Sequence, residues 1–179
     1  MIKAILVFIT LFSLDNLTAI FFSNQPLFGS YLVVPYLLLI GICLQVFYDE
    51  KNYAPWIAFA FGLVYDIYGT NLLGMYATMF PIIVILIKKH VVSITPVNFV
   101  SIFYVSIVAI LAVETIVYIL VIIITTRSMS IFSFIQHRLM STLIFNTILL
   151  LIVYAPLVKI LKPREEKKVK TIMTDNTTA

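Results

Sequence analysis

Six apolar runs, separated by short polar segments, constrain this chain more than any other feature of its sequence. Hydrophobic residues make up 62% of the chain and charged residues 11%, whereas a soluble domain is about half apolar and a quarter charged. The mean hydropathy is +1.10. These values predict an all-α, polytopic membrane protein whose first domain, residues 1–161, is a bundle of six transmembrane helices. The runs cover residues 2–22, 31–48, 54–68, 72–87, 97–126 and 131–161.

The lengths of the runs bear on how many of them cross the bilayer. The first run is about 20 residues long and contains Asp15, so it is interpreted as a span and not as a cleaved signal peptide. Runs three and four are about 15 residues each, or roughly 23 Å, which is shorter than a ~30 Å hydrocarbon core. Their pattern fits either two short spans or one re-entrant hairpin.

The basic residues predict the orientation. With six spans the two termini share one side, and ten of the twelve Lys and Arg residues fall on that side. This asymmetry predicts that both termini are cytoplasmic, in a bacterial cell membrane, and a re-entrant hairpin would leave it unchanged. The basic segment after the last run, residues 162–179, is predicted to be a disordered cytoplasmic tail. The two basic residues on the other side are Arg127 and Arg138.

Small and polar residues recur at every fourth position of the third run. Side chains four apart lie on one helix face, and a face of small residues lets a neighbouring helix approach closely. We therefore expect Ala58, Gly62 and Asp66 to face another helix and not lipid. Asp66 is expected either to accept hydrogen bonds from the turn at Gly69 or to pair with Arg138. The complete series is Ala54, Ala58, Gly62, Asp66 and Thr70.

Four ionisable residues lie inside the runs, and all four fall in the outer half of the bilayer in the predicted topology: Asp15, Asp66, Glu114 and Arg138. Charges at this depth are costly, so such residues usually face the bundle and find partners. Arg138, Thr142 and Asn146 form a second stripe, expected to face Asp66 or Glu114. Alternatively, Arg138 reaches out to the interface. The aromatic belt at the interface is predicted to hold Tyr31, Tyr36, Tyr48, Tyr53 and Trp56.

Catalysis and cofactor binding have no sequence signal. The single cysteine, Cys43, cannot form a disulfide within the chain or a cysteine metal site. No phosphate-binding loop, HExxH or Ser–His–Asp set is present, and the predicted loops are too short to build a catalytic domain. The net charge of +4 lies in topology-determining segments and does not indicate nucleic-acid binding. We therefore expect neither an enzyme nor a cofactor.

The segment FAFGLVYDIYGTNLLGMYA resembles the MreD family, the integral membrane subunit of the bacterial elongasome. That family has a G-[LF]-x-x-D signature followed by a Leu-Gly pair, which correspond here to Gly62, Asp66, Leu73 and Gly74. The small size and the six apolar runs extend the resemblance over nearly the whole chain.

The resemblance implies a non-enzymatic scaffold of the cell-shape and peptidoglycan-synthesis machinery. It implies binding to the single-span protein MreC and coupling of the cytoskeletal MreB to cell-wall synthases, a RodA-type glycosyltransferase and a class B penicillin-binding protein. It also implies a six-helix fold similar to the substrate-binding subunits of energy-coupling-factor vitamin transporters. The alternative function is therefore a membrane subunit that binds a small solute for transport. The polar cluster in the outer half favours that alternative, because a ligand pocket needs convergent polar groups.

Overall fold

The computed structural model describes residues 2–23, 32–49, 52–70, 74–92, 95–124 and 130–161, and all regular structure in these ranges is helical. Short π-helical turns continue three of the helices, at Asp66–Thr70, Lys88–Val92 and Ile135–Leu139. Leu73 and the predicted tail, residues 162–179, lie outside the described residues. The helices are α1 (Ile2–Ser23), α2 (Leu37–Phe47), α3 (Ala54–Tyr65), α4 (Met75–Ile87), α5 (Phe99–Ile124), α6 (Ile131–Phe134) and α7 (Met140–Leu161).

Four helical segments are long and apolar enough to cross a membrane: Ile5–Phe22, Met75–Val92, Phe99–Ile124 and Ile131–Leu161. The second and third runs form shorter apolar helices, Leu37–Phe47 and Ala54–Tyr68. The protein is therefore an all-helical membrane protein with four long helices and two short ones among its described residues.

The second run is helical over only part of its length. The sequence gives one apolar run over residues 31–48, but the helix begins at Leu37, and residues 32–36 precede it without helical structure. Pro35 explains the late start, because proline has no N–H to donate and disfavours helical geometry at the residue before it, Val34. The fourth run, by contrast, is part of a longer helix. The apolar run stops at Ile87, but the helix continues through Lys88 and Lys89 to Val92.

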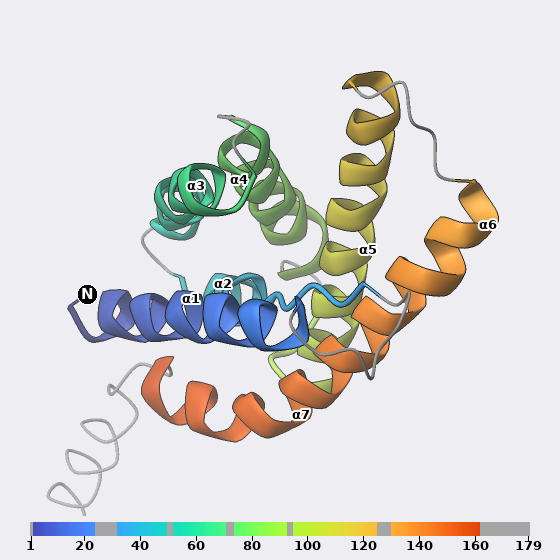
Figure 1. Ribbon diagram of the computed structural model, residues 1–179. Coiled ribbons are helices and arrows are strands. Elements are labelled where there is room, and N and C mark those ends of the chain that lie inside the picture. Colours follow the sequence, from blue (N-terminus) through green and yellow to red (C-terminus); the bar gives the residue numbers. More distant parts are fainter. Residues whose placement is uncertain are drawn as a thin grey trace, which may run out of the picture.

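Helix α2 occupies the centre of the bundle. It contacts α1, α3, α4, α5 and α7, and Figure 1 shows it behind α1 with the α3–α4 hairpin above and α7 below. Every residue of α2 except Gln45 is buried, including Cys43. A helix that is apolar on all sides is stable only when other elements surround it. Helices α1, α3, α4, α5 and α7 therefore form a shell around α2.

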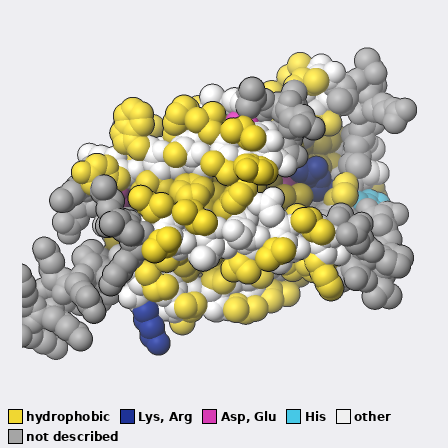
Figure 2. All heavy atoms as spheres, turned by 60° about the vertical axis from the view of Figure 1, so that its left-hand side comes forward, with side chains coloured by type: hydrophobic (Ala, Val, Ile, Leu, Met, Phe, Trp, Pro, Cys, Tyr) yellow, Lys and Arg dark blue, Asp and Glu magenta, His cyan; other side chains and the backbone are white. Residues whose placement is uncertain are grey.

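The outer surface of this shell is apolar. Figure 2 shows a face covered mainly by hydrophobic side chains, with few charged groups. Large hydrophobic side chains are exposed on α1, α3, α5 and α7, such as Leu17, Trp56, Val100 and Ile152. A soluble monomer rarely exposes so large an apolar area, so this surface is suited to contact with lipid.

Candidate functional site

The family-like motif forms the junction between α3 and α4. Asp66 is fully buried where α3 ends, and its carboxylate accepts hydrogen bonds from three backbone N–H groups at the start of α4. The donors are Gly74 (2.9 Å), Tyr76 (2.8 Å) and Ala77 (3.0 Å). The first N–H groups of a helix have no partner within the helix, and a carboxylate there also interacts favourably with the helix dipole. Asp66 therefore caps α4.

Gly62 and Gly74 allow this junction to be close. A Cβ atom on Gly62 would lie 2.5 Å from the carbonyl oxygen of Tyr76 and 2.7 Å from the Cα of Ala77, so α3 and α4 touch through their backbones. Gly74 has a φ of 100°, a left-handed conformation that favours glycine. Ala58 is also fully buried. The small-residue face of α3 thus packs inside the chain, against α4.

Asp15 on α1 caps α2 in the same way. Its two oxygens accept hydrogen bonds from the N–H groups of Leu37 (2.7 Å) and Leu38 (2.9 Å), and from the hydroxyl of Tyr65. Asp15 is buried, and these three protein donors take the place of water around its carboxylate. Its position follows from the late start of α2, because that helix begins in the interior and its first N–H groups require an acceptor there.

Asp49 makes a third cap, at the start of α3, outside the apolar helices. It accepts hydrogen bonds from the N–H groups of Tyr53 and Ala54, both at 3.0 Å, and from Lys88 Nζ at 3.0 Å. Lys88 also donates to the carbonyl of Asp49 at 2.6 Å, which fastens the end of α4 to this loop. Burial alone would raise the pKa of Asp49, but the hydrogen bonds from Ala54, Lys88 and Tyr53 outweigh it, and the pKa is lowered.

The ion pair between Glu114 and Arg138 joins α5 to the turn before α7. Arg138 Nε donates to Glu114 Oε2 at 2.7 Å, and the Tyr36 hydroxyl donates to Glu114 Oε1 at 2.8 Å. Glu114 and Tyr36 are fully buried, and the Arg138 side chain is 24% exposed. The carboxylate therefore has a charged partner and a neutral donor in place of water.

Residues 32–36 are held by the polar stripe on α7. Tyr36 N–H donates to Asn146 Oδ1 at 2.7 Å, and Asn146 Nδ2 donates to the Val34 carbonyl at 2.7 Å. Val34 N–H donates to Thr142 Oγ1 at 3.3 Å. Leu32 N–H donates to the carbonyl of His137 at 2.8 Å. Backbone outside a helix is tolerated at membrane depth only when its polar groups have protein partners, and α7 and the π-helical turn before it supply them here.

The four ionisable residues expected to form one cluster divide into two kinds of contact. Arg138 pairs with Glu114, whereas Asp15 and Asp66 each bind the backbone at a helix start. The alternative pairing of Asp66 with Arg138 is wrong, because Arg138 Nε donates to Glu114 and the Asp66 carboxylate binds backbone N–H groups. The Arg138 side chain remains 24% exposed.

The sequence interpretation missed two residues of this network. Tyr36 was expected in the interfacial belt, but its side chain is fully buried and bound to Glu114. Pro35 is the available signal, because it predicts an interrupted helix whose neighbours must be satisfied by other side chains. Asp49 lies in the polar segment between the second and third apolar runs and was not among the candidate residues. Pro55 could have identified Asp49 as a helix cap. Proline favours the first turn of a helix, and a side-chain acceptor is expected a few residues before it in the sequence.

The geometry of these groups is that of structural contacts. Within the described residues, no three or more His, Cys, Asp or Glu side chains are grouped so that they could hold a metal ion. Each of the buried carboxylates already accepts two or more hydrogen bonds from the protein. Their arrangement ties helices together across the interior.

Comparison with protein families agrees with this arrangement. Residues 1–164 match the family model described as rod shape-determining protein MreD. The chain belongs to the MreD family. The match covers all the described residues, including the Gly62–Asp66 junction and the Glu114–Arg138 pair. No curated protein and no solved structure matches the chain.

Membership of the MreD family gives the chain a role in determining rod shape. MreD proteins are structural membrane proteins and are not a known enzyme family. The apolar helices described above agree with a membrane protein of this kind.

Proposed function

We propose that this chain is a non-enzymatic scaffold of the cell-wall elongation machinery in the bacterial cell membrane. It binds the span of an MreC-like protein and helps to couple MreB to a RodA-type glycosyltransferase and a class B penicillin-binding protein. The family match and the internal use of the buried polar groups support this proposal. A rigid bundle with an apolar exterior offers helix faces on which the spans of partners pack.

The observation that carries the proposal is the internal bonding of the three buried carboxylates inside the apolar runs. Asp66, Asp15 and Glu114 all accept hydrogen bonds from the chain itself and tie helices together. A subunit that binds a small solute would instead direct several polar groups toward a shared cavity. We therefore prefer the scaffold to the solute-binding alternative.

Co-purification tests the scaffold. The chain is co-expressed with a tagged MreC-like protein from the same organism, extracted in mild detergent and captured through the tag. We expect stoichiometric retention. The control carries the same tag and periplasmic domain on an unrelated polyleucine span. Equal capture with both spans, or capture with neither, would contradict the proposal, as would a chain that purifies alone with a bound small molecule.

We also propose six crossings with both termini in the cytoplasm. Four residues before Tyr36, at up to about 3.3 Å each, together with the 11-residue helix α2 at about 1.5 Å each, reach ~30 Å, enough for one crossing. Ala54–Tyr68 and Met75–Val92 then cross as a thin hairpin of two spans. The positive-inside asymmetry supports the orientation.

Cysteine labelling tests this topology. Cys43 is fully buried, so the natural chain should give little labelling of its own. A cysteine placed at Asn24, Asn71 or Ser128 should react with an impermeant reagent applied from outside, and one at Asn52 or Thr177 should not. Labelling at Asn52 but not at Asn24 would reverse the orientation. Failure at Asn71 alone would indicate the re-entrant hairpin.

A further inference from the structure

Helix α1 contacts the rest of the bundle along one narrow stripe. Within residues 5–22, only Phe8, Leu11 and Asp15 are buried. Residues three and four apart lie on the same face of a helix, so these three positions define a single buried face. Figure 1 shows α1 at the front of the bundle, lying across α2. The opposite side of α1 is therefore open to the membrane.

The open side of α1 has the side-chain spacing of a helix pair. Its central positions follow one another at alternating steps of three and four residues, which is the spacing with which two helices pack in a left-handed pair. Four of the five side chains are exposed, and the fifth, Asn16, is partly buried. We call this series the α1 seam, and its members are Leu6, Ile9, Ser13, Asn16 and Ile20.

Asn16 is the member of the α1 seam with unused hydrogen-bonding groups. Its Nδ2 donates to the carbonyl of Phe12 at 2.8 Å, one turn earlier on the same helix. An amide side chain has two donor hydrogens and an acceptor oxygen, so one N–H and Oδ1 are left without a partner among the described residues. The hydroxyls of Thr10, Ser13 and Thr18 differ, because each of them donates to a carbonyl of α1.

The position of Asn16 along α1 places its amide inside the hydrocarbon. Helix α1 has 22 residues, or roughly 33 Å, close to the ~30 Å of a hydrocarbon core. Asn16 lies seven residues, about 10 Å, before the end of this helix. Lipid chains offer no hydrogen bonds, so polar side chains at such a depth usually bond to another helix.

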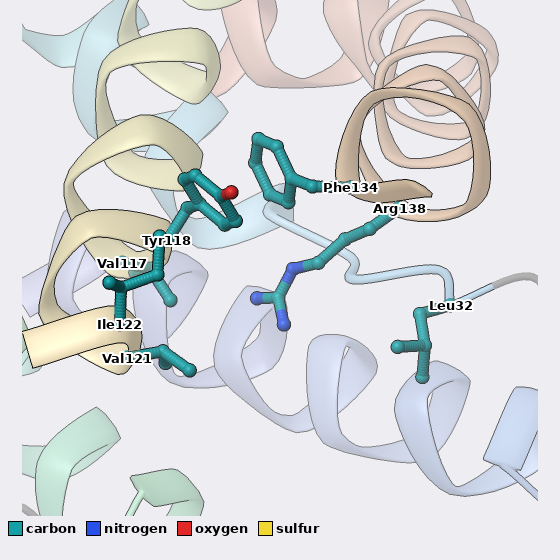
Figure 3. A pocket seen from close by; sticks show the side chains of 7 residues that line it. All are labelled: Leu32, Val117, Tyr118, Val121, Ile122, Phe134 and Arg138. Carbon is teal, nitrogen blue, oxygen red and sulfur yellow. The ribbon is translucent and has the colours of Figure 1, made fainter. Parts of the chain in front are cut away.

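Two other parts of the surface offer less to a helix. The open face of α7 presents Ile144, Ile148 and Ile152, which are exposed aliphatic side chains suited to lipid. The cavity between α5 and the α6 end of the last helix has a volume of about 70 Å³, too small for a helix about 10 Å wide. Figure 3 shows Arg138 in the lining of this cavity, and that side chain is paired with Glu114.

We propose that two copies of this chain pair in the membrane through the α1 seam, with Asn16 of one copy hydrogen-bonded to Asn16 of the other. Copies of one membrane protein share an orientation, so a two-fold axis along the bilayer normal brings their α1 helices together in parallel. Each seam position then meets the same position of the second copy, at the same depth. A carboxamide is both donor and acceptor, so two of them satisfy each other.

The second copy fits the seam better than an unrelated span does. An unrelated span would need a polar side chain at the depth of Asn16, whereas the two-fold axis provides one in the second copy. A single asparagine in such a seam also fixes the register and the number of helices. The pairing does not depend on MreC binding or on the scaffold function.

Disulfide cross-linking of the full chain in native membranes tests the pairing. Ser13→Cys places a thiol at the centre of the α1 seam, where the two copies approach closely enough for a disulfide. Its matched control is Ile148→Cys, on the open face of α7. The wild-type chain, whose one cysteine is the buried Cys43, is the blank. We expect Ser13→Cys to give a product of twice the mass of the chain, and Ile148→Cys to give little of it.

Substitutions of Asn16 in the Ser13→Cys chain test the hydrogen bond. We expect Asn16→Leu to lower the yield of the cross-linked pair about tenfold, the effect of one or two hydrogen bonds between helices. Asn16→Gln, which keeps the carboxamide, should retain most of the yield. The printed bond of Asn16 lies within α1, so both variants should keep the wild-type helix content by circular dichroism. Equal yields from Ser13→Cys and Ile148→Cys, an unchanged yield in Asn16→Leu, or a cross-link from position 13 to a different protein would overturn the proposal.

Discussion

The α3–α4 hairpin and the opposite side of the bundle, where α5 meets α7, both contain a buried carboxylate, but they use it differently. In the hairpin, Asp66 binds backbone N–H groups that lie only 8 to 11 positions further along the chain. On the other side, Glu114 binds the side chains of Arg138, 24 positions away, and Tyr36, 78 positions away. One junction is encoded locally, and the other joins distant parts of the sequence.

The difference concerns what each junction requires. The hairpin needs only a glycine at position 62 and a hydrogen-bond acceptor at position 66. Both residues contact backbone atoms of α4, which are present whatever the side chains of α4 are. The α5–α7 junction needs particular side chains on three separate elements, and it fails if one of them is lost. We therefore expect substitutions on the α5–α7 side to be coupled to one another, and substitutions in the hairpin to depend on shape.

The largest effect is expected for Arg138→Ala. It leaves Glu114 buried without its cation, which costs about 3–5 kcal/mol in comparable cases. The measurement is the free energy of unfolding in detergent. The double variant Glu114→Leu/Arg138→Leu should recover much of that loss, because it removes both charges. A single variant with wild-type stability would show that the junction does not depend on the ion pair.

Gly62→Ala should come next, at about 2–3 kcal/mol, since its Cβ would meet the backbone of α4. The matched control is Gly41→Ala in α2, whose Cβ would meet side chains and no backbone: the end of Leu11 at 2.5 Å and the Phe8 ring at 3.4 Å. There the gain in helix propensity, about 1 kcal/mol, offsets the contact. Both are measured as shifts in unfolding temperature. Equal effects of the two substitutions would contradict a backbone contact as the cause.

Asp66→Ala is expected to cost about 2 kcal/mol, because buried N–H groups at the start of α4 lose their acceptor. Asp66→Asn should fall between Ala and the wild type. The native carboxylate uses both oxygens, Oδ1 for Tyr76 and Oδ2 for Gly74 and Ala77, and an amide offers only one. Hydrogen exchange of these amides should report the loss directly. An Asn variant as unstable as Ala would indicate that charge, and not hydrogen bonding, matters at this junction.

The smallest effect is a pH dependence at Asp49. Its folded pKa is lowered below the ordinary value, so the stabilisation is fully present above an unfolded pKa of about 3.9. The stabilisation is lost as the pH falls through the folded pKa. A protonated Asp49 carries no negative charge, so its ion pair with Lys88 is lost. We expect a loss of about 1 kcal/mol in acid. Asp49→Asn should flatten that part of the profile, and an unchanged profile would rule Asp49 out as its source.

The sequence predicted the membrane class and the close packing at Gly62 for physical reasons. Hydrophobic run length and the four-residue spacing of small side chains are local properties of the sequence, so they can be recognised without knowing the tertiary contacts. The burial of Tyr36 could not be predicted in this way. It depends on Glu114 and Asn146, and nothing near Tyr36 in the chain specifies either of them.

The start of α2 marks a second limit. An apolar run predicts that a segment lies in the membrane, but not whether its backbone is helical throughout. Pro35 shifted the helix start to Leu37, and Asp15 and α7 supply the acceptors that make this possible. The partner of an intramembrane polar group is determined by tertiary packing, which is why Arg138 had two candidate acids in the sequence.

The hydrogen bonds between residues 32–36 and α7 have a consequence for how the protein is made. Tyr36 is 110 positions before its partner Asn146 in the sequence, so it is synthesised well before the last helix. Until α7 is inserted, Val34 and Tyr36 lack the partners that satisfy their backbone in lipid. We therefore expect the bundle to close around α2 only after the last helix has been inserted.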